Sequence, residues 1–331
     1  MSHVSNKEVT DGVIPQTFAF IGDTEVGARL GAHLLQAGYT ASNDFAQAEV
    51  VFTYAGSPSL LEDVYYGTPG LIQDAADGAL LVDLSPTVPS FARELNAVAA
   101  VNNRYFIDAP FTLRDTSVED AFIDARNIII LAGGSEKIYK RVHPLLSCMA
   151  KTCRYMGGVG AGQTAKVALT LQNAASLMGM VEAFASHSFT EDAYDLDELF
   201  DIASTAGFIA PAMAGVFDAL CNKAYRGTYT MEMLMGELNA ALMFSEEQET
   251  AFPQADSAFH LLQLLGVVGA AQLAPTGAVL AFATQDEATS FGLDWSRAEG
   301  MYHDHDEDDE DDNDFIFDDE DFESDFDENA R

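Results

Sequence analysis

The chain has 331 residues, 48% of them hydrophobic, and a formal net charge of −37. This length and apolar content suffice for the cores of two domains. The negative charge excludes nucleic acid as an expected partner, because phosphate binding needs clustered Lys and Arg. Three cysteines, at spacings that fit neither a disulfide framework nor a C-x-x-C pair, suit a reducing cytoplasm. No basic segment followed by an apolar run indicates a signal peptide, and the most apolar stretch is too short to span a membrane.

Strands and helices alternate in the first half of the chain. An apolar run at 18–21 predicts a strand, followed by a turn at Gly22 and a helix that ends at Gly38. Further patterns predict strands at 50–53, 79–82, 105–107 and 127–131, with helices at 60–66 and 91–101. This alternation predicts an α/β fold with a mostly parallel, Rossmann-like sheet over residues 16–161.

The second half shows only helical spacing. After Gly162 a stretch without Pro or Gly runs to Gly179 and repeats apolar residues at helical intervals. Further helices are predicted at 193–203, 211–222, 231–244 and 255–265, and no strand pattern recurs up to about Ser290. We therefore expect an all-α domain over residues 162–300.

Both ends differ in composition from the rest. Residues 304–331 hold 17 acidic residues against one Arg, with four Phe among them. Such a segment cannot bury enough apolar surface to offset the entropy that ordering costs. We expect residues 301–331 to be a disordered acidic tail, with the Phe residues leaving room for a docking motif, and residues 1–15 to be a disordered N-terminus.

The turn between the first strand and helix has the form of a dinucleotide-binding turn. Residues 20–27, FIGDTEVG, keep the first and last glycine of G-x-G-x-x-G, at Gly22 and Gly27, and carry Thr24 in place of the middle one. In such a turn the glycines let the backbone approach a pyrophosphate at the helix N-terminus. The position of the turn, directly between a strand and a helix, favours this interpretation.

Four later segments follow in the order and spacing of a known family. They are residues 82–89 (VDLSPTVP), 108–110 (DAP), 131–135 (LAGGS) and 158–166 (GVGAGQTAK). They look like the motifs D-x-S-[ST]-x-x-P, D-A-P-V-S-G-G, V-G-G-D and G-x-G-x-x-x-K. Over residues 17–300 the chain thus resembles the β-hydroxyacid dehydrogenases, which include 3-hydroxyisobutyrate and tartronate semialdehyde reductases.

The resemblance implies an NAD(P)-dependent oxidoreductase that transfers hydride between a nicotinamide and a small hydroxyacid or carbonyl. It marks Lys166 as the general acid/base, whose pKa burial would lower. It implies cofactor contacts from Gly22, Asp23, Thr24, Glu25, Val26, Gly27, Asp44, Tyr54, Ala55 and Pro86. It implies substrate contacts from Ser85, Thr112, Leu113, Arg114 and Thr170. No metal site is expected.

The cofactor side departs from the family in two places. Thr24 adds a side chain at the pyrophosphate, and Glu25 places a carboxylate where an anion would bind, so affinity should suffer. About twenty residues of the adenosine side are missing before the strand at 50–53. Asp44 is either a ribose ligand or a plain turn residue, and its neighbour Phe45 offers no charge for a 2′-phosphate, which favours NAD over NADP.

The substrate side departs as well. The S-G-G of the family becomes residues 112–114, Thr-Leu-Arg, and Arg114 is either a carboxylate ligand or a surface cation. The family's Asn four residues after the lysine is Thr170, on the same helix face. Its K-D-L-x-x-A becomes GELNAA at 236–241, so a second active-site lysine is absent. Pro86 replaces the hydroxyl residue expected beside the nicotinamide.

Three functions remain open at this stage. The first is an oxidoreductase of this family, and the second is a catalytically degenerate relative that serves ligand sensing or protein interaction. The third, an imine reductase, is disfavoured by Lys166, which such enzymes usually replace. The resemblance also implies a homodimer or larger assembly, in which the apolar helix from Gln163 packs against a second copy.

Overall fold

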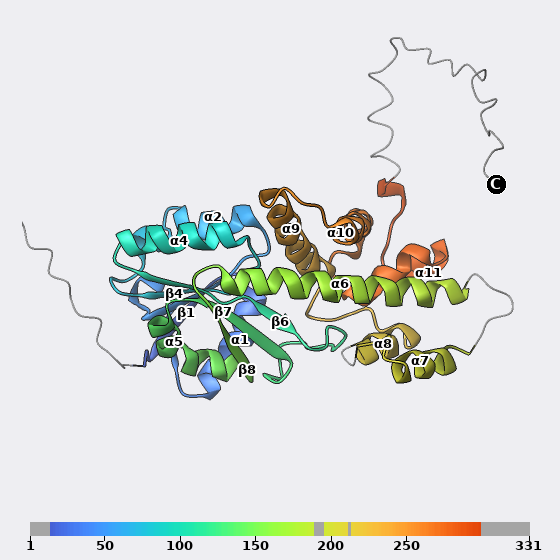
Figure 1. Ribbon diagram of the computed structural model, residues 1–331, viewed down its shortest axis with the longest axis horizontal. Helices are drawn as coiled ribbons and strands as arrows, with labels where there is room; N and C mark the ends of the chain where they lie inside the picture. Colours follow the sequence, from blue (N-terminus) through green and yellow to red (C-terminus); the bar gives the residue numbers. More distant parts are fainter. Residues whose placement is uncertain (1–13, 189–194, 211–212, 299–331) are drawn as a thin grey trace, which may run out of the picture.

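The computed structural model describes residues 14–188, 195–210 and 213–298. It has a sheet domain and a helical domain, joined by the long helix α6 (Ala161–Ser188), which runs from the sheet through the second domain (Figure 1). The acidic tail predicted at 301–331 and most of the predicted N-terminal segment lie outside the described residues.

One sheet holds the strands of the described residues. They are β1 (Thr17–Gly22), β2 (Thr40–Ala41), β3 (Val50–Tyr54), β4 (Leu80–Asp83), β5 (Tyr105–Asp108), β6 (Phe111–Leu113), β7 (Ile128–Gly134) and β8 (Thr152–Gly157). The order is β2-β1-β3-β4-β5-β7-β6, and β8 also pairs with β7. Only the pairs of β7 with β5 and β6 are antiparallel, so the predicted mostly parallel α/β fold is confirmed.

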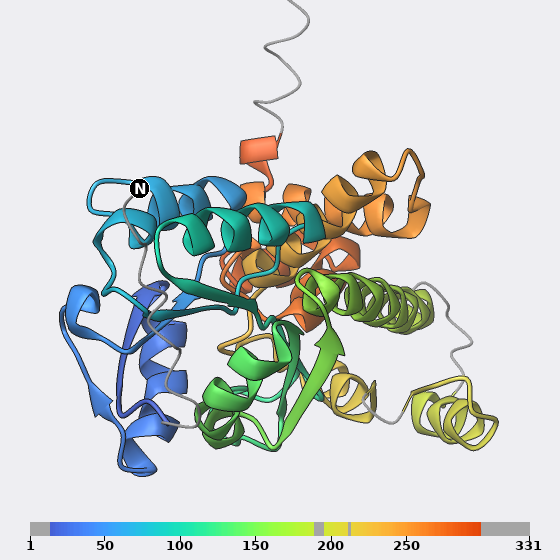
Figure 2. The same cartoon turned by 60° about the vertical axis from the view of Figure 1, so that its left-hand side comes forward.

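Helices cover both faces of the sheet, so its central strands are buried and mostly apolar. Helices α1 (Thr24–Gln36) and α5 (Glu136–Met149) lie on one side, and α2 (Pro58–Tyr66), α3 (Leu71–Asp74) and α4 (Pro89–Val101) on the other (Figure 2). Every residue of β3 is buried. Alternate residues face the two sides: Val51 and Leu81 belong to the core under α2 to α4, Phe52 and Val82 to the core under α1 and α5.

The sheet ends beside β1 in a very short strand. Strand β2 has two residues, pairs with the start of β1, and is followed only by a 3-10 turn, η1 (Phe45–Gln47), before β3 begins. No additional strand or α-helix lies between β2 and β3 among these described residues. Only η1 therefore lies between β2 and β3, and β2 forms the edge of the sheet.

Helices pack along α6 in the second half. They are α7 (Leu196–Thr205), α8 (Ala214–Cys221), α9 (Met231–Glu247), α10 (Pro253–Leu265), a π-helical turn η3 (Gly266–Ala270), a 3-10 segment η4 (Pro275–Phe282) and α11 (Gln285–Ser290). No strand occurs beyond β8 in the described part of the chain, as predicted. No single described helix meets the length and hydropathy expected of a membrane span, although the bent pair of residues 253–270 and 275–282 does so jointly.

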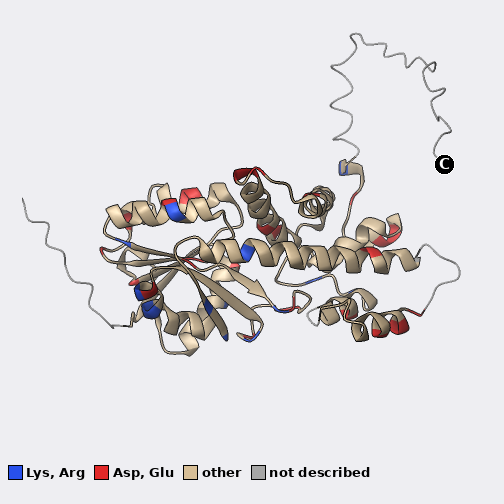
Figure 3. Ribbon diagram, viewed as in Figure 1, with Lys and Arg blue, Asp and Glu red and all other residues tan. Residues whose placement is uncertain are grey.

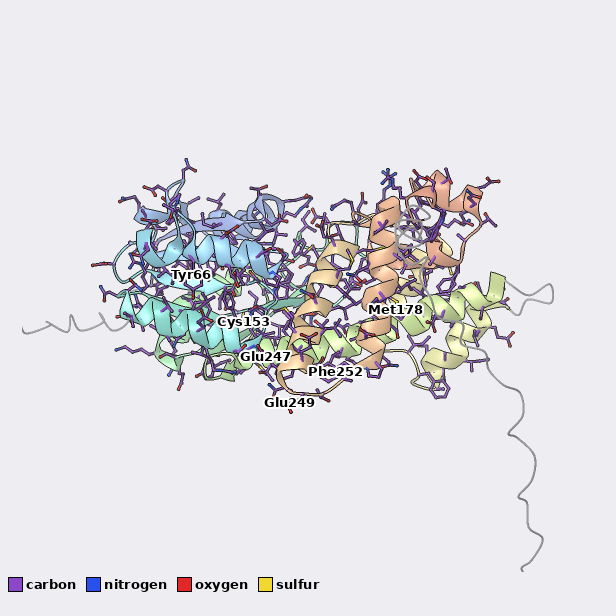
Figure 4. All side chains as sticks on the ribbon, turned by 90° about the horizontal axis from the view of Figure 1, so that it is seen from above. Tyr66, Cys153, Met178, Glu247, Glu249 and Phe252 are labelled. Carbon is purple, nitrogen blue, oxygen red and sulfur yellow. The ribbon has the colours of Figure 1, made fainter. Side chains whose placement is uncertain are left out.

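The end of α9 reaches back to the sheet domain. Figure 4 shows Glu247 and Glu249 where α9 ends and Phe252 where α10 follows. The carboxylate of Glu247 accepts a hydrogen bond from the Ser90 hydroxyl of α4. The two domains therefore touch at this end as well as through α6.

Charge is unevenly placed between the domains. Figure 3 shows Lys and Arg on α5 of the sheet domain and acidic residues on α7 and α11 of the helical domain. Part of the chain's excess of acidic residues therefore lies on the outer helices of the second domain, away from the sheet.

Candidate active site

The turn between β1 and α1 needs glycine at both ends. Gly22 has φ +106°, and a Cβ there would overlap the carbonyl oxygen of Tyr54. A Cβ at Gly27 would come within 3.2 Å of the Phe20 Cβ on β1. The first glycine thus lets β1 turn against β3, and the last lets α1 pack close to the sheet, as in a dinucleotide-binding turn.

Asp23 caps α1 with its own side chain. Its Oδ1 accepts hydrogen bonds from the backbone N–H groups of Glu25 (2.8 Å) and Val26 (2.9 Å). Free N–H groups at a helix start are the donors that bind an anion such as a pyrophosphate. The carboxylate therefore holds two of the donors that a phosphate would use.

A cleft of about 600 Å³ opens beside this turn. It is bordered by the turn, the end of β3, helices α2 and α3, and the segment that leads into α9. Its lining includes six predicted cofactor contacts: Gly22, Asp23, Glu25, Val26, Tyr54 and Ala55. The other four, Thr24, Gly27, Asp44 and Pro86, do not line it, so the cleft brings together only part of the predicted set.

The charges of this cleft are mostly negative. Four carboxylates and one guanidinium line it: Asp23, Glu25, Asp63, Glu232 and Arg29. Arg29 is paired with Glu25 at 3.0 Å and with Asp120. The one arginine of the cleft lining is therefore already neutralised by acidic neighbours.

A second glycine turn, before α6, is held by a carboxylate of the sheet. Asp108, the last residue of β5, accepts hydrogen bonds from Gly160 N (2.8 Å) and Gln163 N (3.1 Å). A Cβ at Gly162 would overlap Leu131 O and crowd the Asp108 carboxylate. Burial raises the pKa of Asp108, while the backbone N–H donors oppose this rise. The start of α6 is thus fixed to β5.

Gln163 fixes the loop after β4. Its Oε1 accepts from Thr87 N at 3.1 Å, and its Nε2 donates to Ser85 O at 2.8 Å. The Ser85 hydroxyl accepts from Ala55 N at 2.9 Å. The predicted substrate contact Ser85 therefore lies against Ala55, a residue of the cofactor cleft.

Lys166 is buried in an ion pair. Its Nζ lies 2.6 Å from Glu237 Oε2 of α9, and the two side chains are only 4% and 7% exposed. The Thr170 hydroxyl, one turn along α6, donates to the same Glu237 oxygen at 3.0 Å. Burial lowers the pKa of Lys166, and Glu237 counteracts part of this fall. An amine with a lowered pKa is what general acid/base chemistry needs.

Two buried tyrosines accompany this pair. Burial, followed by the charge of Glu237, raises the pKa of Tyr229 and of Tyr54 well above the ordinary value of tyrosine. Both hydroxyls therefore stay protonated. Tyr54 also lines the cleft beside α1, so the charge of Glu237 acts on a residue of that cleft.

Glu237 is the site residue that sequence reasoning missed. The available signal was the segment 236–241, where Glu237 follows the position of the family's second lysine. At that position stands Gly236, where a Cβ would be 2.5 Å from Gly56 O. The backbone of the sheet domain therefore occupies the space of a side chain at 236, and the neighbouring Glu237 is turned to Lys166.

The predicted substrate loop is in fact a strand. Residues 111–113 form β6, which pairs with β7 in the register Thr112 with Ile129 and Leu113 with Ile128. Apolar side chains at 111 and 113 and the adjoining β7 account for this difference, because a buried edge strand satisfies backbone groups that a loop would leave unpaired. Arg114 follows β6, is exposed, and donates to Arg126 O (3.0 Å) and Thr152 Oγ1 (2.9 Å).

A further carboxylate is buried in the sheet. Asp83 ends β4, is fully buried, and accepts from Ser85 N and the Thr53 hydroxyl, each at 3.0 Å, through Oδ1. Its Oδ2 has no hydrogen-bond partner among the described residues. Burial raises the pKa of Asp83 to about 7, against the opposing hydrogen bonds.

The shape of the site fits a nicotinamide dinucleotide. In the glycine turn a Cβ at Gly22 would overlap Tyr54 O and one at Gly27 would crowd Phe20, and the cleft has the volume of a ligand site. The donor set fits less well, because the N–H groups of Glu25 and Val26 already serve Asp23. Binding of a pyrophosphate there requires Asp23 to release them.

Known proteins share this architecture. Residues 28–158 match the family described as the NAD binding domain of 6-phosphogluconate dehydrogenase. The chain is 28% identical over 194 residues to an uncharacterized oxidoreductase, YkwC, of Bacillus subtilis, a match that covers 51% of this chain and 66% of that protein, just under two thirds. It is 29% identical over 269 residues to a probable mitochondrial 3-hydroxyisobutyrate dehydrogenase of Arabidopsis thaliana, covering 70% and 77% of the two chains.

A solved structure has a similar fold. The Mycobacterium tuberculosis 3-hydroxyisobutyrate dehydrogenase with L-serine superposes with a TM-score of 0.69 at 21% identity, over 82% of this chain and 100% of that one. At this identity the likeness concerns the fold, a Rossmann-like domain followed by a helical one.

Proposed function

Because the chain belongs to the β-hydroxyacid dehydrogenase family of the 6-phosphogluconate dehydrogenase superfamily, we propose that it is an NAD(P)-dependent oxidoreductase acting on a small hydroxy compound or its carbonyl form. The observation that carries this proposal is the buried Lys166, paired with Glu237 at 2.6 Å at the start of the helix that joins the two domains. Burial lowers the pKa of this amine, as proton transfer to or from a substrate oxygen requires.

Lys166 moves the proton of the reaction. A bound nicotinamide supplies or accepts the hydride. In the oxidation direction the substrate hydroxyl gives its proton to the neutral amine of Lys166, while the carbon beside that oxygen gives up its hydrogen as hydride. In the reduction direction the Lys166 ammonium returns the proton to the carbonyl oxygen. Glu237 and Thr170 hold the amine in place through the contacts described above.

The cleft beside α1 would hold the dinucleotide. Gly22, Val26 and Ala55 border it with backbone or small apolar groups, and Tyr54 lines it with a side chain whose pKa is raised by burial and by the charge of Glu237. Thr24, Gly27, Asp44 and Pro86 remain predicted contacts. NAD is proposed over NADP, because Arg29 is engaged by Glu25 and Asp120 and is not available to a 2′-phosphate.

Other parts of the proposal rest on the resemblance. Ser85, Thr112, Leu113, Arg114 and Thr170 stay the predicted substrate contacts. Packing of α6 against a second copy would give a homodimer or larger oligomer, which sedimentation at micromolar concentration tests. A cytoplasmic location is proposed from cysteine usage alone.

Titration of NADH and NADPH into the purified protein, followed by nicotinamide fluorescence, tests the cofactor. The Lys166→Ala variant should bind the cofactor like the wild type but lose at least about 100-fold in turnover. Since neutral amine is the base, the oxidation rate should rise with pH and the reduction rate should fall, both with a midpoint below 10.5. Equal turnover by wild type and Lys166→Ala would refute the role of the lysine.

One observation favours a second candidate, a relative that keeps the scaffold for ligand sensing or protein interaction. Asp23 occupies the N–H groups of α1 that a pyrophosphate would use. Absence of binding at millimolar NADH and NADPH, by a folded protein, would favour this candidate over the oxidoreductase.

A further inference from the structure

The charges around Lys166 define a substrate class. Resting on the proposed function, we infer that Glu237 makes the site select against carboxylates, so that the substrate carries an uncharged or cationic group where a β-hydroxyacid carries its carboxylate. The inference concerns specificity, and it departs from the hydroxyacid that the family resemblance implies.

The buried pair leaves no free positive charge for a substrate carboxylate. Lys166 Nζ and Glu237 Oε2 lie 2.6 Å apart and are almost fully shielded from water. When Lys166 acts as the neutral base of the proposed reaction, the negative charge of Glu237 has no ammonium beside it. A carboxylate brought next to Glu237 would add a second unpaired negative charge, whose burial is strongly unfavourable, whereas a cationic group would pair with Glu237.

No other buried cation in the described part of the chain is available to pair with it. Apart from Lys166, the one buried Lys or Arg described is Arg104. Its guanidinium donates to the backbone carbonyls of Gln73, Ala75 and Asn102. Arg104 is therefore committed to holding the loop after α3.

Arg114 is the remaining cation near the substrate side. It borders, with Glu237, a small cavity of about 20 Å³, the size of one water molecule. The Arg114 side chain is exposed, and its Nε and Nη2 donate to Arg126 O and Thr152 Oγ1. These two donors of Arg114 are therefore engaged by groups other than Glu237.

The other polar groups of the site are neutral or committed. Thr170 already donates to Glu237, and Tyr229 is a protonated phenol influenced by the same carboxylate. The segment in the position of the family's substrate loop pairs with β7 as strand β6. Gly56 O occupies the space that a lysine side chain at position 236 would need. An ammonium therefore meets the opposite charge of Glu237, an amide brings no charge, and a carboxylate meets repulsion.

Three probes with one carbon skeleton and different charge test this: 3-hydroxypropanoate, 3-hydroxypropanamide and 3-aminopropan-1-ol. Oxidation by the full chain is followed with NAD⁺ and NADP⁺. We expect kcat/KM for the amide or the amine to exceed that for the acid by about tenfold or more. The Glu237→Gln variant should lose this preference. Glu237→Asp, which keeps the charge, and Glu246→Gln, on an exposed position of the same helix, should retain it.

A second measurement separates charge selection from turnover. Binding of the same probes is read by saturation-transfer NMR, with and without cofactor. Preferential binding of the amide or amine without turnover would mean that the proposed function fails while the charge selection stands. Preference of the wild type for the acid would overturn the inference, and loss of that preference in Arg114→Gln would identify Arg114 as the anchor. Failure of all three probes to bind or react would overturn it as well.

Discussion

Helices α1 and α6 both begin at a glycine turn that a carboxylate caps, but the caps come from different places. Asp23 lies one residue before α1 and satisfies its N–H groups locally. Asp108 lies at the end of β5, 52 residues before Gly160, and satisfies the start of α6 across the sheet. The local cap takes the place of a ligand, whereas the distant cap attaches the helix to the sheet and fixes the lysine two turns along.

The two turns therefore differ in how they can serve catalysis. At α1 Asp23 accepts from the N–H groups that a pyrophosphate would use, so the start of the helix is capped without a ligand. At α6 the capped start presents Lys166 to Glu237, and the side chains of this pair are buried together. A cap that comes from the tertiary structure can orient a site without blocking it.

Breaking the ion pair at α6 should have the largest effect. Lys166→Met leaves Glu237 buried without its cation, and we expect a loss of about 3–5 kcal/mol in the free energy of unfolding. The double variant Lys166→Met/Glu237→Leu removes both charges and should recover most of this loss. Urea denaturation measures both. Equal stability of the wild type and Lys166→Met would show that the pair is not buried as described.

Removing the distant cap should cost somewhat less. Asp108→Ala leaves the N–H groups of Gly160 and Gln163 buried without an acceptor, at a cost of roughly 3 kcal/mol. Hydrogen exchange should show faster opening at the start of α6 and unchanged protection in α1. Unchanged exchange in α6 would contradict the role of Asp108.

The pKa of Asp83 is that of a buried carboxylate that accepts few hydrogen bonds. Its folded-state pKa of about 7 lies above the ordinary 3.8, so the folded protein holds a proton that the unfolded chain releases. The contribution of this group to the free energy of unfolding is largest below pH 3.8 and is lost as the pH rises through 7.

Between pH 5 and 7 the wild type should accordingly lose on the order of 2 kcal/mol relative to Asp83→Asn. Urea denaturation of both proteins at several pH values measures the difference. A stability difference that does not change with pH would mean that Asp83 is ionised throughout this range.

Removing the local cap should have the smallest effect on stability. Asp23→Ala should cost about 1 kcal/mol and, because it frees two N–H groups and removes a negative charge, should tighten NADH binding. Asp195→Ala is a matched control, since Asp195 caps α7 through Asp197 N and Glu198 N in the same way. Thermal denaturation and fluorescence titration measure the two effects. Tighter binding in both variants, or in neither, would argue against competition at α1.

Much of the fold followed from local patterns. The continuous apolar run at 50–53 predicted a buried parallel strand, and β3 is buried along its whole length. The turn at Gly22 and the stop at Gly38 bounded α1, and both glycines have positive φ. The glycine-rich segment before Lys166 identified the helix that joins the domains. These features depend on residues close in sequence, whose periodicity and backbone freedom the sequence displays directly.

Tertiary structure decided the partners of the buried charges. Lys166 is paired with Glu237 from α9, a residue whose role no spacing along the chain indicated. Residues 111–113 became a strand because β7 lies beside them, and Gly236 is required because Gly56 O approaches it. Which groups meet inside a protein depends on how its elements pack in space, and a buried charge takes the opposite charge that this packing brings within reach.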